Sequence, residues 1–246
     1  MATYVLVPGF WLGGWVWEAV GARLRAAGHE VHQVTLTGLG DRAHLATPEV
    51  GIETHTLDVV NTLRYGDLRE VILVGHSGGG LPVAQAADRV SERLTRVVYL
   101  ESVPLPDGTR QFDVNPPEAR TEIERRVAEE GEGWRLPPPP FAEVAEDPRN
   151  LAGLNPADLR LLRERSVPQP FATATEPLRR THRSTPVPET LIACMFAEEQ
   201  VRRMIADKHP MMAGFDGVPQ VVPLPTGHYP MLSRPDDTAR ALASLA

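Results

Sequence analysis

The sequence VILVGHSGGGLPV, residues 71–83, decides the fold. An apolar run over 71–74 ends at Gly75, Ser77 follows among further glycines, and an alanine-rich helical pattern begins after them. A buried strand that turns sharply into a helix crowds the residue at the turn, and glycines on either side remove the clashing Cβ atoms. This pattern predicts that the Ser77 hydroxyl projects above the carboxyl end of a sheet, where open α/β sheets bind ligands.

Short apolar runs alternate with helical patterns along most of the chain. The runs predict strands at Tyr4–Val7, Val31–Leu36, Val71–Val74, Val97–Leu100, Thr190–Phe196 and Gln220–Pro223. The helical patterns cover about Trp15–Ala27, Glu53–Tyr65, Gly80–Val90, Glu198–Ala206 and Pro235–Leu245. Several strands are apolar on both faces, as in a parallel sheet that helices cover on both sides. The sequence therefore predicts an α/β fold with a doubly wound, mostly parallel sheet.

The alternation stops between Pro104 and Pro188, a segment that holds most of the 24 prolines, including PPPP at 137–140. Two amphipathic helical patterns lie within it, PPEARTEIERRVAEE and NPADLRLLRERS. Such an interruption is too long for a plain loop, and its leucines and phenylalanines supply apolar surface that a disordered linker lacks. We expect a helical cap subdomain, residues 107–186, inserted into a core formed by residues 1–106 and 187–246.

The composition is that of a globular protein with 25 basic and 32 acidic side chains and a net charge of −7. No basic run favours nucleic acid or an anionic membrane, and no apolar stretch approaches the roughly 20 residues of a membrane span. Because the N-terminus lacks a secretion-signal pattern, we expect a cytoplasmic protein. The single cysteine, Cys194, excludes an internal disulfide and should be buried in the core. Nothing specifies an oligomeric state, so a homodimer stays open.

Residues 75–79 fit the G-x-S-x-G pattern of a nucleophile that lies between a strand and a helix. A serine at its ordinary pKa is a weak nucleophile and needs a base. His228 follows a predicted strand and a tight turn, which places it at the same edge of the sheet. We predict Ser77 as nucleophile and His228 as general base. The alternative for Ser77 is a helix-capping serine in a glycine-rich turn; a phosphate loop is disfavoured because no lysine follows the glycines.

Negative charge that develops on a substrate carbonyl needs hydrogen-bond donors fixed in advance. The backbone N–H groups of Gly78 and of Phe10, in the loop VPGFWLGGWVW, are the predicted oxyanion-hole donors. Apolar residues are expected to line a pocket for a small or aromatic group, although the same types are common in any core: Phe10, Trp11, Leu12, Leu81, Val103, Met211, Met212 and Tyr229. No metal is implied, because the chain has no H-E-x-x-H and no compact cluster of histidines and aspartates.

Together these motifs resemble the α/β-hydrolase superfamily, and within it the branch of plant methyl esterases and hydroxynitrile lyases. The matching stretches are YVLVPGFWLGGWVWEAVGARLRAAGHEV, LTGLGDRAH, VILVGHSGGGLPV, RVVYLESVPLPDG and PTGHYPMLSRPDD. The resemblance implies a sheet of six to eight strands under a helical cap, hydrolysis of small esters, and no cofactor. It also implies the family's roles for Ser77, His228 and the amides of Phe10 and Gly78.

Two departures from the family pattern bear on activity. The family usually has His-Gly where this chain has Pro8-Gly9, so the hydrogen bonding of that loop must differ. The lyases of the branch carry a lysine directly after the catalytic histidine to stabilise cyanide, and here that residue is Tyr229. Lyase activity therefore loses its specific support.

The acid that completes the triad is the third departure. The family usually places an aspartate after the strand that corresponds to TLIACMF, but this chain continues FAEEQVRRM. Glu198 and Glu199 are available there, or they open the next helix, where carboxylates are favourable. Glu101 ends the buried strand RVVYLES, where some α/β-hydrolases place their acid, and a buried carboxylate needs a partner such as His228. We predict Glu101; its alternative is a structural carboxylate that bonds backbone amides.

The predicted activity is the hydrolysis of a small carboxylic ester through an acyl-enzyme on a Ser-His-Glu triad. A small-molecule ester is the expected partner. Two other functions stay open: a lyase on the same triad, and a hydrolase-fold binding protein whose triad has decayed.

Overall fold

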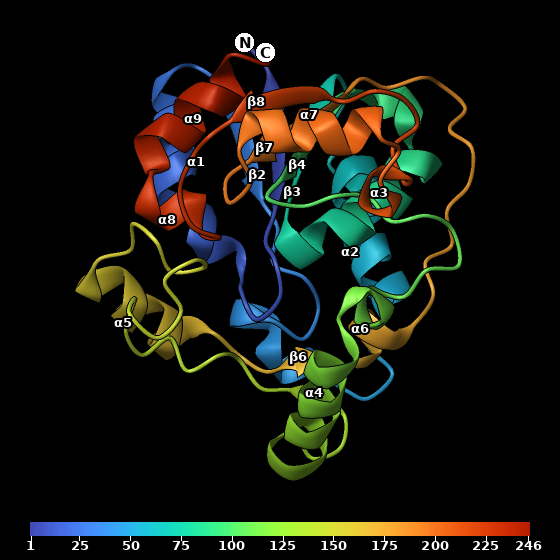
Figure 1. Cartoon of the computed structure of the whole chain (residues 1–246). Helices are drawn as coiled ribbons and strands as arrows, with labels where there is room; N and C mark the ends of the chain where they lie inside the picture. Colours follow the sequence, from blue (N-terminus) through green and yellow to red (C-terminus); the bar gives the residue numbers. More distant parts are fainter.

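A six-stranded parallel sheet forms the centre of the computed structural model, which describes residues 1–246 (Figure 1). The strand order is β2-β1-β3-β4-β7-β8, and every neighbouring pair is parallel. The strands are β1 (Thr3–Val7), β2 (Glu30–Gln33), β3 (Val71–His76), β4 (Leu94–Leu100), β7 (Glu189–Ala193) and β8 (Gln220–Pro223). The predicted α/β class with a doubly wound parallel sheet is confirmed.

The strand β3 is central and buried along its whole length. Val74 lies opposite Leu6 of β1 on one side and Val98 of β4 on the other. A central parallel strand has helices over both faces, which is why its sequence is a continuous apolar run rather than an alternating one. It ends at His76, directly before Ser77.

Helices cover both faces of the sheet. On one face α1 (Glu18–Ala26) packs against α9 (Pro235–Ala243), and Leu24 and Leu242 join the core cluster there. On the other face lie α2 (Ile52–Tyr65), α3 (Gly80–Arg89) and α7 (Glu198–Ala206). Strand β1 alternates between the two clusters, with Tyr4 and Leu6 in the first and Val5 and Val7 in the second. The two clusters are the two layers of a three-layer fold.

Several predicted elements differ from the structure by a few residues at their ends; β4, for example, begins at Leu94 rather than at Val97. The helix predicted from Trp15 begins as a 3₁₀ turn, Gly14–Trp17, before α1. The strand predicted over 31–36 ends at Gln33, which is paired with Leu6, one residue before β1 itself ends. The strand predicted over 190–196 ends at Ala193, because the next two N–H groups donate to the carboxylate of Glu101 instead of to a neighbouring strand.

The cap segment, residues 107–186, lies between β4 and β7. It contains α4 (Pro117–Glu130), β5 (Arg135–Leu136), α5 (Pro156–Arg165), β6 (Gln169–Pro170) and α6 (Ala172–Thr175). Its two amphipathic patterns form α4 and α5, and α5 starts with a capping box between Asn155 and Asp158. Figure 1 shows α4, α5 and α6 at the end of the molecule opposite the two chain termini.

The remaining elements are short. They are α8 (Pro230–Ser233) and the 3₁₀ turns Gly14–Trp17, Gly40–Leu45, Ser77–Gly79, Ser91–Arg93, Gln111–Val114 and Pro210–Met212. None of the helices is both long enough and apolar enough to pass through a membrane.

A buried ion network attaches the returning end of the cap segment to the core. Asp88 of α3 accepts from Arg180 at 2.5 Å and from Arg183 at 3.2 Å, and Arg183 also bonds Glu189 at 2.8 Å. The Asp88 side chain is 1% exposed and that of Arg183 is 3% exposed. Removing one partner from such a network leaves a buried charge unpaired, which is strongly destabilising. The network therefore fixes where the cap segment re-enters the sheet.

Candidate active site

The turn from β3 into α3 holds Ser77 in the left-handed region of backbone space, with φ at 49°. A Cβ atom on Gly75 would lie 2.8 Å from the Cα of Gly80, and one on Gly79 would overlap the carbonyl oxygen of Pro8. A non-glycine residue with positive φ is strained and persists only where its surroundings impose it. The glycines are thus required by the close approach of three chain segments, as the sequence pattern predicts.

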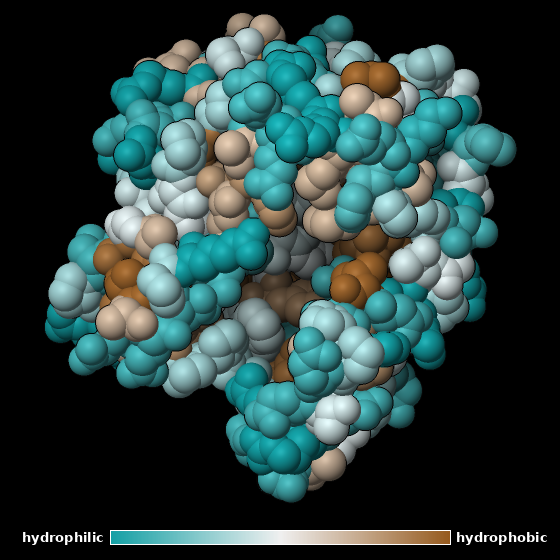
Figure 2. All heavy atoms as spheres, viewed as in Figure 1, coloured by the Kyte–Doolittle hydropathy of each residue, from teal (hydrophilic) through white to brown (hydrophobic).

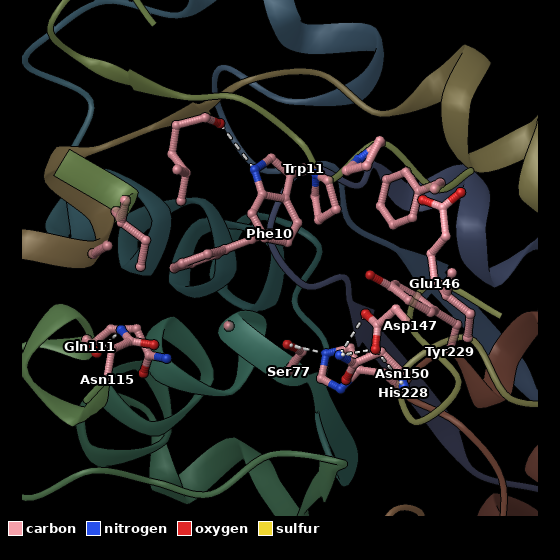
Figure 3. A pocket seen from close by; sticks show the side chains of 18 of the residues that line it. Phe10, Trp11, Ser77, Gln111, Asn115, Glu146, Asp147, Asn150, His228 and Tyr229 are labelled. Carbon is pink, nitrogen blue, oxygen red and sulfur yellow. Dashed lines mark hydrogen bonds between the residues drawn. The ribbon is translucent and has the colours of Figure 1, made fainter. Parts of the chain in front are cut away.

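The side chains of Ser77 and His228 meet at the edge of the sheet. His228 lies in the loop between β8 and α8, and its Nε2 is 2.8 Å from the Oγ of Ser77 (Figure 3). A nucleophile and a base at hydrogen-bond distance are the minimum that general-base activation of a serine requires. The structure therefore brings together the two residues that the sequence singles out most strongly.

His76, the last residue of β3, is hydrogen-bonded to the loop of His228 from the core side. Its side chain is fully buried, and its Nε2 donates a hydrogen bond of 2.7 Å to the carbonyl oxygen of His228. Burial, with a smaller contribution from His228, lowers the pKa of His76 to about 3. His76 is therefore neutral near pH 7, with its proton on Nε2. From the sequence, a histidine directly before Ser77 is expected to pack or to hydrogen-bond beside the turn, and this hydrogen bond agrees with that expectation.

Burial also lowers the pKa of His228, to about 4, and the negative charge of Asp147 partly offsets that effect. A histidine with a lowered pKa is neutral at pH 7, so its Nε2 can accept the proton of Ser77. Its Nδ1 is buried and has no hydrogen-bond partner in the protein.

The loop after β1 packs directly on the turn that holds Ser77. A Cβ atom on Gly78 would overlap the ring of Phe10, and one on Gly9 would lie 2.9 Å from the Cβ of Ser77. The N–H of Trp11 donates to the side-chain oxygen of Gln169 at 3.0 Å, whereas the N–H of Phe10 makes no hydrogen bond within the protein. The predicted donors Phe10 and Gly78 therefore lie together beside Ser77, and Phe10 has a free N–H.

Glu101 lies where the sequence places it, at the end of β4, but its contacts differ from the predicted ones. One carboxylate oxygen, Oε2, accepts the N–H groups of Cys194 at 2.7 Å and of Met195 at 3.1 Å. Burial raises the pKa of Glu101, and these two hydrogen bonds act in the opposite direction. No hydrogen bond joins Glu101 to His228 in this structure, so the contacts match the alternative of a carboxylate that bonds backbone amides.

Glu198 and Glu199, the other carboxylates considered for the triad, lie in the first turn of α7. Glu198 bonds Arg202 one turn later, at 2.6 Å and 2.8 Å, and Glu199 is exposed. Neither residue lines a pocket at Ser77. Their position is the one that carboxylates commonly take at the start of a helix.

Two chambers meet at Ser77, and Gly78, Gln111 and His228 line both of them. The large chamber, about 560 Å³, lies mainly against the cap segment, and Figure 2 shows an opening with apolar atoms at its base between that segment and the core. The small chamber, about 280 Å³, lies against the core and is lined by Glu101 and by apolar side chains. Two chambers that meet at one serine hydroxyl can hold two substituents of a molecule bound at that serine.

The predicted pocket residues divide between the two chambers, with one exception. Phe10, Trp11 and Tyr229 line the large chamber, and the small one is lined by Leu81, Val103, Met211 and Met212. The prediction for Leu12 is wrong: it is 1% exposed, packs in the core cluster beside α1 and lines neither chamber. The chain turns at Trp11, where φ is 67°, and this directs the next side chain inward.

The cap segment supplies pocket residues that the sequence does not reveal. They are Gln111, Phe112, Asn115, Ile123, Leu136, Pro139, Pro140, Phe141, Ala142, Glu143, Glu146, Asp147, Asn150, Leu151, Phe171 and Ala174. None of them belongs to a motif, and only contacts far apart in the sequence bring them to Ser77. Their one available signal is the concentration of proline and phenylalanine in the segment.

Comparison with known proteins gives matches over nearly the whole chain. The model of the alpha/beta hydrolase family matches residues 4–241. The carbendazim hydrolyzing esterase of Nocardioides sp. is 32% identical over 257 residues, which cover 100% of each chain. Methylesterase 9 of Arabidopsis thaliana is 34% identical over 118 residues, 48% of this chain and 44% of that protein.

A solved structure shares the fold along the whole chain. An extracellular alpha/beta-hydrolase from a Paenibacillus species superposes with a TM-score of 0.83 over 99% of this chain and 98% of its own, at 22% identity. At that level of identity the match establishes the fold alone. The full-length relative and the plant methylesterase agree with the resemblance drawn from the motifs.

Proposed function

The chain belongs to the alpha/beta hydrolase family, and we propose that it is a serine esterase that cleaves small carboxylic esters through an acyl-enzyme. The observation that carries the proposal is the 2.8 Å contact between Ser77 Oγ and His228 Nε2 at the junction of two chambers. The esterase relative at 32% identity over its full length supports the same reaction class.

In the proposed reaction His228 takes the proton of Ser77 as Oγ attacks the ester carbonyl. The N–H groups of Phe10 and Gly78 hold the oxyanion that forms. His228 then gives the proton to the leaving alcohol, and the acyl group remains on Ser77. Water, activated by His228 in the same way, releases the acid and restores the serine.

We propose Glu101 as the carboxylate that supports His228 when the imidazolium forms. Its Oε1 accepts no hydrogen bond within the protein, and the Nδ1 of His228 is buried without a partner. Both residues line the small chamber. A charged imidazolium in so buried a site needs a nearby anion, and Glu101 is the carboxylate that lines the same chamber on the core side.

The walls of the large chamber favour a neutral ester with an aromatic substituent. Aromatic side chains line it, together with the carboxylates of Glu143, Glu146 and Asp147, and no lysine or arginine does. An anionic substituent would meet like charges without a compensating cation. Since the full-length relative is named for carbendazim, that compound belongs beside simple aryl esters in the first substrate set.

Hydrolysis of p-nitrophenyl acetate, butyrate and octanoate by the wild type and by Ser77→Ala tests the proposal. We expect the variant to lose at least about a thousandfold in kcat, since the nucleophile is absent. A fluorophosphonate should label the wild type at Ser77 and leave the variant unlabelled. Equal hydrolysis by both proteins would show that Ser77 is not the nucleophile. A wild type that neither hydrolyses esters nor takes the label would favour a decayed binding protein.

A further inference from the structure

The loop that carries His228 is attached to a turn of the cap segment, residues 147–153, which we call the cap turn. The N–H of His228 donates to the carbonyl oxygen of Asn150 at 2.7 Å, and the N–H of Gly227 donates to that of Ala152 at 3.2 Å. On its other side the same loop accepts the hydrogen bond from His76. His228 is thus held between the core and the cap turn. The cap-turn residues that it and Gly227 bond lie 75 or more residues earlier in the sequence.

The contact is too close for a side chain at position 227. A Cβ atom on Gly227 would lie 2.5 Å from the carbonyl oxygen of Asn150 and 2.7 Å from the N and O atoms of Ala152. The cap turn is itself anchored, because Leu151, and Leu154 directly after the turn, are buried in the same core cluster as Tyr229. The cap turn and the loop of His228 are therefore in direct backbone contact and are joined by two hydrogen bonds.

Asp147 fixes the conformation of the cap turn. Its carboxylate accepts the backbone N–H of Asn150 at 3.3 Å and the side-chain amide of Asn150 at 2.8 Å and 3.0 Å. Asp147 forms no salt bridge, and it lines the large chamber with His228 (Figure 3). A carboxylate that carries no cationic partner and lies on the wall beside the base is placed to act on the charge of that base.

We propose that Asp147, through Asn150, is a positioning residue for His228, so that the cap segment holds the base in line with Ser77 and stabilises its protonated form. The inference rests on the proposed function, because it assigns His228 the role of base. The other titratable groups that face His228 or line a chamber with it are Glu143 and Glu146 from the cap segment, Glu101 from the end of β4, His76 from the end of β3 and its own neighbour Tyr229. Among the carboxylates that line a chamber with His228, Asp147 is the one that is hydrogen-bonded to Asn150, whose carbonyl oxygen accepts the N–H of His228.

The charge of Asp147 raises the pKa of His228 against the effect of burial. Asp147→Asn removes the charge and keeps an oxygen that can accept from Asn150. We expect kcat to fall roughly tenfold at pH 7, with KM within about twofold, because the imidazolium is less stabilised in the transition state. The acidic limb of kcat/KM should move to lower pH by about half a unit or more.

If Asp147 had only a structural role, Asp147→Asn would not shift the acidic limb of kcat/KM. Asp147→Glu retains the charge and should restore the limb and part of the rate. Glu124→Gln is the matched control for the loss of one negative charge from the cap segment, because Glu124 is exposed on α4 and makes no hydrogen bond. This variant should keep both the wild-type kcat and the wild-type acidic limb of kcat/KM. Gly227→Ala, which separates the cap turn from the base, should lower kcat by more than Asp147→Asn does.

Two outcomes decide the inference. If Asp147→Asn matches the wild type in both kcat and acidic limb, the inference is wrong. If the wild type hydrolyses no ester, the proposed function fails, and titration of His228 by NMR in the wild type and in Asp147→Asn still answers the question. A lower pKa for His228 in the variant supports the coupling, and an unchanged pKa overturns it.

Discussion

The core and the cap segment each form one side of the cavity around Ser77, and they do so by different means. On the core side, Gly75, Gly78 and Gly79 have no space for a side chain, and the positions of the nucleophile and of the Phe10 loop follow from that local packing. On the cap side, the cap turn and the aromatic side chains of the large chamber are brought to Ser77 only by contacts between residues far apart in the sequence. Local packing therefore places the Ser77 turn and the Phe10 loop, whereas the chamber wall and the support of the His228 loop depend on contacts between distant segments.

After the loss of Ser77 itself, the largest effect should come from the carboxylate on the core side. Glu101→Gln can still accept the N–H groups of Cys194 and Met195, so the fold should be retained while kcat falls by about a hundredfold through loss of the negative charge. Circular dichroism and kinetics with p-nitrophenyl butyrate would measure the two quantities. Glu198→Gln is the matched control and should keep the wild-type rate. A damaging Glu198→Gln beside a harmless Glu101→Gln would reverse the assignment of the acid.

The close packing of the turn at Ser77 gives the next prediction. Gly79→Ala places a methyl group against the carbonyl oxygen of Pro8, so we expect a loss of about 2–3 kcal/mol in the free energy of unfolding. Labelling by a fluorophosphonate should slow by about thirtyfold, because the Phe10 loop moves away from Ser77. Urea denaturation and labelling kinetics measure these effects. Gly217→Ala, with open space around it, should change neither, and equal behaviour of the two variants would show that the turn is not closely packed.

The cap side is tested by charge on the substrate. With 4-(carboxymethyl)phenyl acetate and its neutral analogue 4-(carbamoylmethyl)phenyl acetate, we expect kcat/KM about tenfold lower for the anion, since Glu143, Glu146 and Asp147 line the large chamber. The difference should shrink as the salt concentration rises from about 0.05 to about 0.5 M. Over roughly this range the Debye length becomes shorter than the width of the chamber. Equal rates at low salt would mean that the aryl group does not enter the large chamber.

The smallest effect concerns pH. Because burial lowers the pKa of His228 to about 4, the base is neutral above that pH, and activity should be lost only as pH falls toward it. We expect kcat/KM to change by less than about twofold between pH 8 and pH 6, whereas a histidine with its ordinary pKa of 6.5 would lose about fourfold. Initial rates at constant ionic strength would decide. A fourfold loss would place His228 in a more polar environment than the structure describes.

The fold was predictable because its signals are local. Continuous apolar runs predict β3 and the strands beside it, and the glycines around Ser77 predict the turn into α3. The same local signals place His228 and the Phe10 loop at the correct edge of the sheet. Strand ends were less accurate where the competing partner is distant, as at the end of β7, where Glu101 takes the next two N–H groups.

By itself the sequence determined the α/β class and the family resemblance and singled out Ser77 and His228 as the proposed nucleophile and base, because each depends on residue types at fixed spacing along one segment. Only the tertiary structure decided that Leu12 belongs to the core, that Glu101 bonds backbone amides, and that the cap turn at Asp147 holds the loop of His228. These features depend on which distant segments meet. Hydrogen bonds and burial between such segments leave no periodic or spacing signal in the chain.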